Sequence, residues 1–365
     1  MGAAAGAATR PHAPHPFTAY CHLSRSESSR RRNKDLMAPD YDDDIYEGKP
    51  MQQLRKSNPE NEWAVVLAGG DGTRLKSLTR KIAGDERPKQ FCCVLGGATL
   101  LEETQRRAAL ELARERTLYV VNRMHEAYYA PILGQERAAN LVIQPRNAGT
   151  APAILYSLLR IAAVAPDAVV AMFPSDHYIS DNRAFMAHIR SALDTAQQRR
   201  DLIILLGVEP ESPEVEYGWI EPNSSWKGHG RVYGVRRFWE KPNQMLAQVL
   251  QLRGCLWNSF VMVASVRALL EIIESSTPEL YRALSCMTSL FGTRTEARAI
   301  DNLYERLEEV NFSHRVLALR PERLAVLKVS GVRWNDLGEP SRVMASLAMA
   351  GIRPHWLDAP QPQFI

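Results

Sequence analysis

The 365-residue chain has few cysteines, no long apolar run and little net charge. Its five cysteines are odd in number and form no Cys-x-x-Cys pair, which argues against a disulfide framework and a structural zinc site. No apolar run approaches the roughly 20 residues of a membrane span. The formal charge of +4 is small for this length, and outside the N-terminal region bases alternate with acids. We expect a soluble, cytoplasmic protein with neither a nucleic acid nor a membrane as partner.

The first sixty residues differ in composition from the rest. They are rich in Ala, Gly, Pro, His and Ser, with a basic run at 30–32 and an acidic run at 40–44. No apolar segment follows a basic one as in a secretory signal, although the Arg- and Ser-rich start loosely resembles a transit peptide. This composition predicts a disordered tail over 1–60. We expect a folded domain over 61–345 and a C-terminal tail over 346–365.

From Trp63 onward, short apolar runs alternate with amphipathic helical stretches, a pattern typical of βαβ units. It predicts an α/β fold with a Rossmann-like, mainly parallel sheet flanked by helices. An antiparallel extension would cap this sheet and build a substrate pocket, which divides the domain into one half over about 61–208 and another over about 209–345. The predicted strands are 64–67, 118–121, 141–143, 168–173, 202–207, 218–221, 231–240, 260–263 and 324–329. The predicted helices are 100–113, 151–165, 183–198, 266–275, 278–290 and 299–307.

The first predicted strand runs into a loop that carries Gly69, Gly70 and Gly72. Glycines let backbone N–H groups approach an anion closely, and Arg74 adds a cationic fork suited to phosphate oxygens. No Gly-Lys-Ser/Thr follows as in a Walker A loop, and Leu75 stands where the dinucleotide fingerprint has its third glycine. The loop is therefore predicted to hold a triphosphate. A plain strand-to-loop turn would explain the glycines, but not Arg74.

A second cation, Lys89, follows Pro88 in the next polar stretch. Proline fixes the local backbone, and a lysine beside Arg74 would neutralise the charge that develops when a triphosphate is cleaved. The alternative is an ordinary solvated lysine in a surface loop.

Two carboxylates end apolar strands far apart in the sequence. Asp176 follows a predicted strand directly, where ligands bind in open α/β sheets, and Asp336 lies in a glycine-bounded loop near the end. Two such residues could converge on one Mg²⁺, a cation that takes carboxylate, water and phosphate oxygens. Alternatively, Asp176 caps the following helix and Asp336 is a turn residue.

The region between these carboxylates offers residues with the chemistry of a sugar pocket. Glu240 and Asn258 can hydrogen-bond hydroxyl groups, Gly218 allows a close backbone approach, and Lys241 could hold an anomeric phosphate. Ordinary surface ion pairing would also explain Glu240 beside Lys241.

Taken together, these segments resemble the sugar-1-phosphate nucleotidyltransferases, in particular the mannose-1-phosphate guanylyltransferases. The matching motifs occur in the family's order from about Trp63 to Pro340: Gly69 to Leu75, Pro88 to Phe91, Gln144 to Ile154, Pro174 to His177, Glu240 to Pro242, Trp257 to Ser259, and Trp334 to Gly338. Three segments depart from the family pattern. Lys76-Ser77-Leu78-Thr79-Arg80 stands where the family usually has Trp-Pro-Leu-Ser-Arg, Val215-Glu216 stands for Thr-Gly, and Phe260 stands for a glycine.

The resemblance implies transfer of a nucleoside monophosphate from GTP to mannose 1-phosphate, giving GDP-mannose and pyrophosphate, with Mg²⁺. It makes 61–208 the nucleotide half and 209–345 the sugar-binding half of the domain. It also implies catalytic roles for Arg74, Lys89 and Asp176. It assigns the nucleotide to Leu67, Ala68, Gly69, Gly70, Gly72, Thr73, Gly149 and Thr150, the sugar phosphate to Gly218, Glu240, Lys241 and Asn258, and the metal to Asp176 and Asp336. Two alternatives stay open: another sugar 1-phosphate with ATP, UTP or dTTP, and an inactive regulator that binds nucleotide sugars. A homo-oligomer also stays open.

Overall fold

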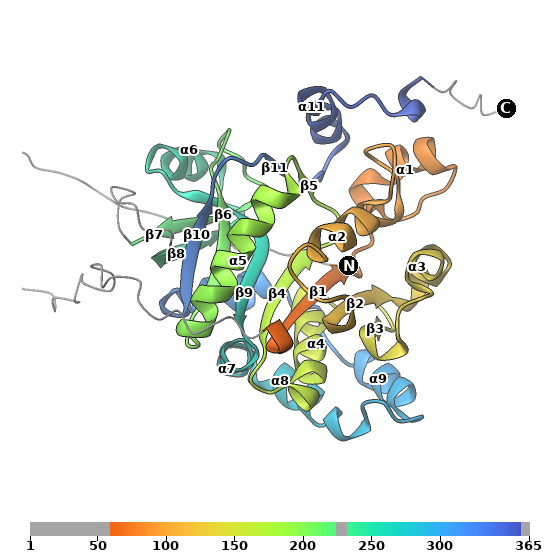
Figure 1. Cartoon of the computed structure of the whole chain (residues 1–365). Helices are drawn as coiled ribbons and strands as arrows, with labels where there is room; N and C mark the ends of the chain where they lie inside the picture. Colours follow the sequence, from red (N-terminus) through yellow and green to blue (C-terminus); the bar gives the residue numbers. More distant parts are fainter. Residues whose placement is uncertain (1–58, 224–231, 359–365) are drawn as a thin grey trace, which may run out of the picture. The chain divides into compact units, whose positions relative to one another are not determined.

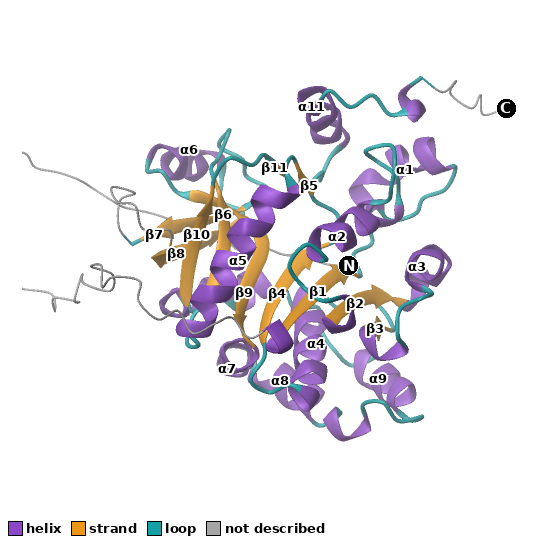
Figure 2. Ribbon diagram, viewed as in Figure 1, coloured by secondary structure: helices purple, strands orange, loops and turns teal. Residues whose placement is uncertain are grey.

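The computed structural model describes residues 59–223 and 232–358, and its main element is a mixed sheet (Figures 1 and 2). The strand order is β3-β2-β1-β4-β9-β6-β10-β8-β7. The strands are β1 (Glu62–Ala68), β2 (Thr117–Asn122), β3 (Leu141–Gln144), β4 (Val169–Pro174), β6 (Ile203–Val208), β7 (Gly218–Pro222), β8 (Val232–Glu240), β9 (Leu256–Ser265) and β10 (Leu324–Val329). The predicted N-terminal tail lies outside the described residues, apart from its last two positions.

The α/β class is confirmed, but the expected Rossmann-like, mainly parallel sheet is not. Strands β1 to β4 pair in parallel, as do β6 and β10. Strand β9 runs antiparallel to β4, β6 and β7, and β8 runs antiparallel to β7 and β10. The reason is that β9 inserts between β4 and β6. It is much longer than the predicted strand at 260–263, and local sequence patterns do not reveal such an insertion.

Helices cover both faces of the sheet (Figure 1). They are α1 (Lys76–Ala83), α2 (Leu100–Ala108), α3 (Glu126–Leu133), α4 (Thr150–Val164), α5 (Asn182–Gln198), α6 (Gln244–Leu252), α7 (Val266–Ser276), α8 (Pro278–Ser285), α9 (Glu296–Tyr304), α10 (Phe312–Arg315) and α11 (Pro340–Ala350). The helices predicted at 151–165, 183–198 and 266–275 are confirmed within one or two residues. Those predicted at 100–113 and 278–290 end earlier, because tighter turns replace their last residues.

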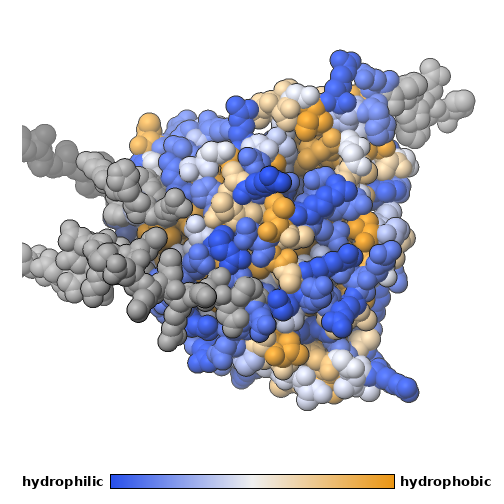
Figure 3. All heavy atoms as spheres, viewed as in Figure 1, coloured by the Kyte–Doolittle hydropathy of each residue, from blue (hydrophilic) through white to orange (hydrophobic). Residues whose placement is uncertain are grey.

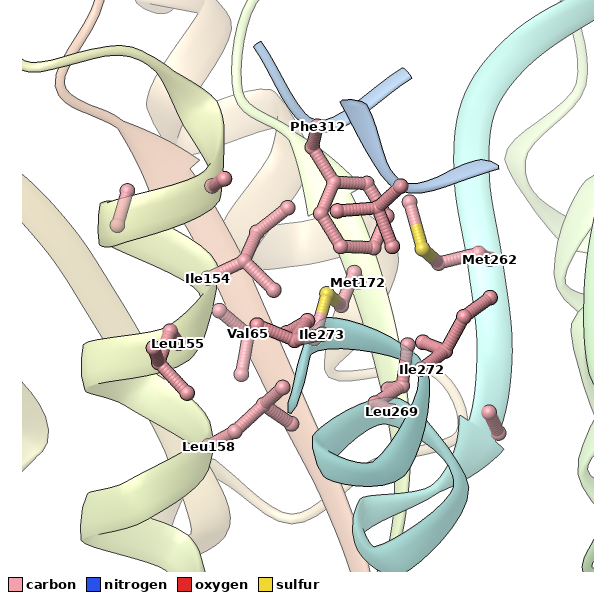
Figure 4. Close-up of a cluster of buried hydrophobic side chains, with 14 of the residues drawn as sticks. Val65, Ile154, Leu155, Leu158, Met172, Met262, Leu269, Ile272, Ile273 and Phe312 are labelled. Carbon is pink, nitrogen blue, oxygen red and sulfur yellow. The ribbon is translucent and has the colours of Figure 1, made fainter. Parts of the chain in front are cut away.

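Alternating side chains of the strands divide the core between the two faces, as the period of two in a strand requires. On β4, Val170 and Met172 join a cluster with α4 and α7, which we call the first core cluster. The intervening Val169, Ala171 and Phe173 join a second cluster with α5. Figure 4 shows Val65 and residues of α4 and α7 meeting in the first core cluster. Burial on both faces holds the carboxyl ends of these strands in place, and the candidate site lies there.

Residues after 345, predicted as a tail, contain part of α11 and the buried Trp356. The Trp356 indole donates a hydrogen bond to the carbonyl of Val94 at 3.1 Å. None of the helices within 59–223 and 232–358 combines the length and apolar character that crossing a bilayer requires. On the face in Figure 3, hydrophilic and hydrophobic residues are interspersed.

Candidate active site

A short antiparallel ribbon brings the two predicted metal-binding carboxylates to one edge of the sheet. Strand β5 (Tyr178–Ile179) begins two residues after Asp176, and β11 (Trp334–Asn335) ends immediately before Asp336. The two strands pair with each other. Asp176 is not the cap of α5, because Asp181 accepts the capping hydrogen bond from the backbone N–H of Ala184.

Lys89 connects the two carboxylate segments. Its Nζ lies 3.2 Å from Asp176 Oδ2, and it donates hydrogen bonds to the backbone carbonyls of Asp336 and Leu337. The residue is 8% exposed, so it is not the solvated surface lysine of the alternative interpretation. A buried ammonium with these partners has a fixed position, which is what charge neutralisation at a reacting phosphate requires.

Asp336 is held by donors on one of its oxygens. Its Oδ1 accepts hydrogen bonds from the Tyr217 hydroxyl at 3.0 Å, the Gly338 backbone N–H at 2.9 Å and Arg342 Nη1 at 2.9 Å. Arg342 also lies 2.9 Å from Glu214 Oε2, with its guanidinium over the Tyr217 ring. Asp336 therefore makes a turn contact and belongs to a half-buried ionic network as well.

The pKa shifts at this edge of the sheet keep the Asp336 carboxylate charged and the His177 imidazole neutral at neutral pH. Burial opposes ionisation of Asp336, but its neighbours His177, Lys89 and Arg342 together hold its pKa below the usual range. Burial lowers the pKa of His177 to about 4. His177 Nδ1 accepts a hydrogen bond from the Trp334 indole at 3.2 Å, consistent with a neutral ring that orients the ribbon.

The glycine-rich loop follows β1 and is packed too closely for side chains at two positions. A Cβ at Gly69 would lie 2.8 Å from Gln144 Nε2. Gly72 has φ +59°, and a Cβ there would lie 3.0 Å from the backbone nitrogen of Lys89. Gln90 fixes the loop by donating to the carbonyls of Ala68 and Gly70 at 3.1 and 2.7 Å. Gly72 is thus required by geometry, a side chain at Gly69 would displace the end of the Gln144 side chain, and a Cβ at Gly70 would meet nothing within 4 Å.

The predicted sugar residues meet around Gly218. A Cβ at this glycine would lie 3.1 Å from Glu240 Oε2 and 3.4 Å from Asn258 Cβ. Burial raises the pKa of Glu240, against the opposing charges of Lys241 and His314.

Lys241 pairs with Glu216 and not with Glu240: its Nζ lies 3.6 Å from Glu216 Oε2. The same oxygen lies 3.3 Å from Arg74 Nη1. Glu216 therefore joins the predicted phosphate and sugar residues.

The loop before α4 is closed by a segment that comes much later in the sequence. Gly149 has φ +85°, and a Cβ there would lie 2.5 Å from the carbonyl oxygen of Val310. The Thr150 hydroxyl accepts a hydrogen bond from the Phe312 backbone N–H at 2.8 Å. Asn147 donates to Asp71 Oδ2 at 2.9 Å, which ties this loop to the glycine-rich loop.

One cavity of about 440 Å³ joins these parts. The predicted residues that line it are Leu67, Gly69, Gly70, Arg74, Gly149, Thr150, Asp176, Glu240 and Lys241. Those not among its lining residues are Ala68, Gly72, Thr73, Lys89, Gly218, Asn258 and Asp336. Of these, Lys89 contacts Asp176, and Gly218 lies close to Glu240 and Asn258. The backbone carbonyl of Asp336 accepts from Lys89, and Ala68 is fully buried. The cavity therefore contains representatives of every predicted group.

A larger cavity of about 790 Å³ lies beside β5, β11 and the end of α11. It is lined by Tyr178, Arg333 and Met349 among others, and by none of the predicted site residues. Volume alone would favour it, but the smaller cavity holds the converging charges, and we assign the candidate site there.

Backbone strain concentrates at the candidate site. Among the described residues, positive φ at a non-glycine position occurs at Lys241, Phe260 and Leu337, with values of 46°, 59° and 50°. Lys241 and Phe260 line the cavity, and the Leu337 carbonyl accepts from Lys89. Strained conformations of this kind persist where surrounding contacts enforce them, and they cluster at functional sites.

Several site residues had not been assigned a role from the sequence. Gln90 and Glu216 lie inside stretches that were singled out, so their neighbours gave a usable signal. Glu309, Asn311 and Ser313 line the cavity beside Thr150, and Arg342 contacts Asp336 from α11. No local pattern marks these four residues, because they reach the site only through the fold.

Residues 63–348 match the model of the family described as nucleotidyl transferase. The chain belongs to this family. A mannose-1-phosphate guanylyltransferase 2 of Escherichia coli O157:H7 is 31% identical over 292 residues, covering 75% of this chain and 58% of the relative. A mannose-1-phosphate guanylyltransferase of Escherichia coli K12 is 28% identical over 284 residues, covering 76% and 58%. This nucleotidyl transferase thus spans less than three fifths of the length of these relatives.

Solved structures agree with this family assignment at the level of the fold. A Thermus thermophilus protein described as a mannose-1-phosphate geranyltransferase is 28% identical, covers 76% of each chain and superposes with a TM-score of 0.65. A Helicobacter pylori protein described as a mannose-6-phosphate isomerase superposes with a TM-score of 0.60 at 21% identity, covering 75% of this chain and 99% of that one.

Proposed function

We propose that this nucleotidyl transferase transfers GMP from GTP to mannose 1-phosphate, giving GDP-mannose and pyrophosphate. The supporting observation is that a single cavity joins the glycine-rich loop and Asp176 to Glu240 and Lys241. A triphosphate at the first end and a sugar phosphate at the second would meet next to Arg74. The relatives named above favour the guanine nucleotide and the mannosyl acceptor.

The chemistry fits the charges in the cavity. An oxygen of the sugar phosphate forms a bond to the α-phosphorus of GTP, and the bond from that phosphorus to the β-phosphate bridging oxygen breaks. The nucleophile is already anionic at neutral pH, so no protein nucleophile is needed. Arg74 and Lys89 would neutralise the charge on the phosphates, and Lys241 would orient the acceptor, so catalysis rests on positioning and electrostatics.

The donor set fits a divalent cation such as Mg²⁺. Asp176 lines the cavity, and the three hydrogen bonds to Asp336 described above all use Oδ1 and none uses Oδ2. Within the described chain no cluster of three or more His, Cys, Asp or Glu side chains could hold a metal. Two carboxylates completed by water and nucleotide oxygens are the usual arrangement for Mg²⁺. When bound, the ion would polarise the phosphates and offset their charge.

We also propose that the reaction takes place in the cytoplasm and that the protein's partners are a nucleoside triphosphate and a sugar 1-phosphate. Whether the chain forms a homo-oligomer stays open, and light scattering of the purified chain measures it.

The decisive experiment is a matrix of nucleoside triphosphates and sugar 1-phosphates, assayed with the full chain for pyrophosphate release. The expected result is the highest kcat/KM for GTP with mannose 1-phosphate, abolished by chelation of divalent metal. A preference for glucose 1-phosphate with ATP, UTP or dTTP would replace the proposed pair by another. Absence of turnover across the matrix, with nucleotide-sugar binding retained, would identify a regulator.

A further inference from the structure

Phe260 has a backbone conformation that favours glycine. Its φ of 59° lies in the left-handed region, where a bulky side chain is an outlier. A residue this unfavourable for the local conformation needs contacts that enforce it and a role for the side chain.

The conformation arises from a bulge in β9. Leu205 on β6 pairs with Met262, whereas Gly207 pairs with Asn258, so two steps on β6 correspond to four on β9. Phe260 is the middle residue of the three between these pairs. Such bulges bend a strand and redirect its side chains next to active sites.

Side-chain hydrogen bonds stabilise the bulge. The backbone N–H of Phe260 donates to Asn258 Oδ1 at 3.1 Å, and that of Val261 donates to Ser259 Oγ at 3.2 Å. The Ser259 hydroxyl in turn donates to the carbonyl of Leu206 at 2.6 Å. These hydrogen bonds therefore hold the backbone at Phe260 in its bulged conformation.

The Phe260 side chain separates the cavity from the core. It is half-buried, it packs against the first core cluster, and it lines the cavity together with Glu240 and Lys241. A glycine would suit the backbone better and would leave the volume of a benzyl group open to ligand. The chain thus tolerates backbone strain at Phe260, and the phenyl ring occupies volume in the wall of the cavity that Glu240 and Lys241 also line.

We propose that Phe260 is a specificity-determining residue that limits the acceptor to sugar 1-phosphates without bulky substituents. The inference rests on the proposed function, because that function assigns this end of the cavity to the sugar. Hexose 1-phosphates with free hydroxyls would fit. Those carrying an acetamido group, which is smaller than the benzyl group, would be excluded by contact with the ring and admitted once the ring is removed.

The test compares Phe260→Gly and Phe260→Ala with the wild type, using mannose, glucose and N-acetylglucosamine 1-phosphates in the pyrophosphate assay. Both variants should raise the ratio of kcat/KM for the acetamido sugar over the best hexose by about tenfold or more, the scale of discrimination by pocket volume. Phe291→Ala is the matched control, because Phe291 also packs partly buried against the first core cluster and does not line the cavity. Its ratio should stay at the wild-type value.

Melting temperatures distinguish the effect of the volume opened in the cavity from the effect of backbone strain at position 260. Glycine relieves the positive φ and alanine does not, so Phe260→Gly should melt no lower than Phe260→Ala. An unchanged acceptor ratio in both folded variants would overturn the inference and leave Phe260 as a packing residue.

Failure of the proposed function would be seen separately, as a wild type that turns over no hexose 1-phosphate. Calorimetric binding of mannose and N-acetylglucosamine 1-phosphates to wild type and Phe260→Gly would then decide the inference. A gain of acetamido-sugar binding in the variant supports it, and equal binding to both proteins refutes it.

Discussion

The proposed phosphate end and the proposed sugar end of the cavity are built in different ways. At the phosphate end, the loop from Gly69 to Arg74 follows one strand, and glycine geometry shapes it. At the sugar end, Gly218, Glu240 and Asn258 come from three antiparallel strands and meet only through their pairing. The first end depends on local backbone conformation and the second on sheet register. Changes at the two ends should therefore affect different kinetic constants.

Asp176→Asn should have the largest effect, a fall in kcat of about 1000-fold, because it removes a charged oxygen at the predicted reacting centre. KM for the sugar phosphate should change little. Steady-state kinetics measures both, with Asp201→Asn as a control, since Asp201 is an exposed partner of Arg199. A comparable loss of kcat in the control, or a normal kcat in Asp176→Asn, would show that Asp176 has no specific role in catalysis.

Gly72→Ala should lower kcat/KM for GTP by about 100-fold. The alanine methyl group would stand at a position of positive φ, 3.0 Å from the backbone nitrogen of Lys89. It must therefore shift the glycine-rich loop or Lys89. Gly97→Ala is the matched control, because a Cβ there meets nothing within 4 Å. Kinetics at saturating sugar phosphate tests this prediction, and unchanged GTP kinetics would show that the loop is not shaped by Gly72.

Glu240→Gln should raise KM for the sugar phosphate by about tenfold and leave KM for GTP unchanged, because a charged hydrogen-bond acceptor is lost. Burial raises the pKa of Glu240, so its carboxylate protonates at a higher pH than an ordinary glutamate. In the wild type, KM for the sugar phosphate should therefore rise as pH falls through this pKa and level off above it. The variant should lack this dependence. A series of KM values measured against pH in both proteins tests this prediction. The same pH dependence in both would show that a group other than Glu240 titrates.

Asn147→Ala should have the smallest effect, a rise of about fivefold in KM for GTP. The side chain links Asp71 to the backbone N–H of Gly149, and a hydrogen bond of this kind contributes about 1 kcal/mol. The sugar phosphate KM should not move. If it changed as much as the KM for GTP, the two ends would be coupled more tightly than their construction indicates.

The parts of the candidate site that the sequence marks are local. The glycine-rich loop and Asp176 each follow a predicted strand, and Lys89 follows a proline. Neighbouring residues in the sequence therefore indicate their positions. The contact of Asp336 with Arg342 and the contact of Thr150 with Phe312 were not predictable. The first needs α11 to pack against the loop after β11, and the second joins residues 162 positions apart.

The same distinction holds for the fold. Apolar periodicity located most of the strands and the long helices, because each strand and helix buries its own face. The insertion of β9 was missed, since strand neighbours are chosen by tertiary packing and leave no local pattern. The bulge that turns Phe260 toward the cavity depends on that insertion as well.

Strand β9 has a consequence for how the chain unfolds. It fills the space between β4 and β6, so the region from Glu62 to Val208 closes its sheet only with a strand that is synthesised later. A fragment ending at Val208 would leave two apolar strands with unpaired edges, a known cause of aggregation. The proposed nucleotide and sugar-binding halves should therefore melt in one cooperative transition, and expressing either half alone should yield insoluble protein.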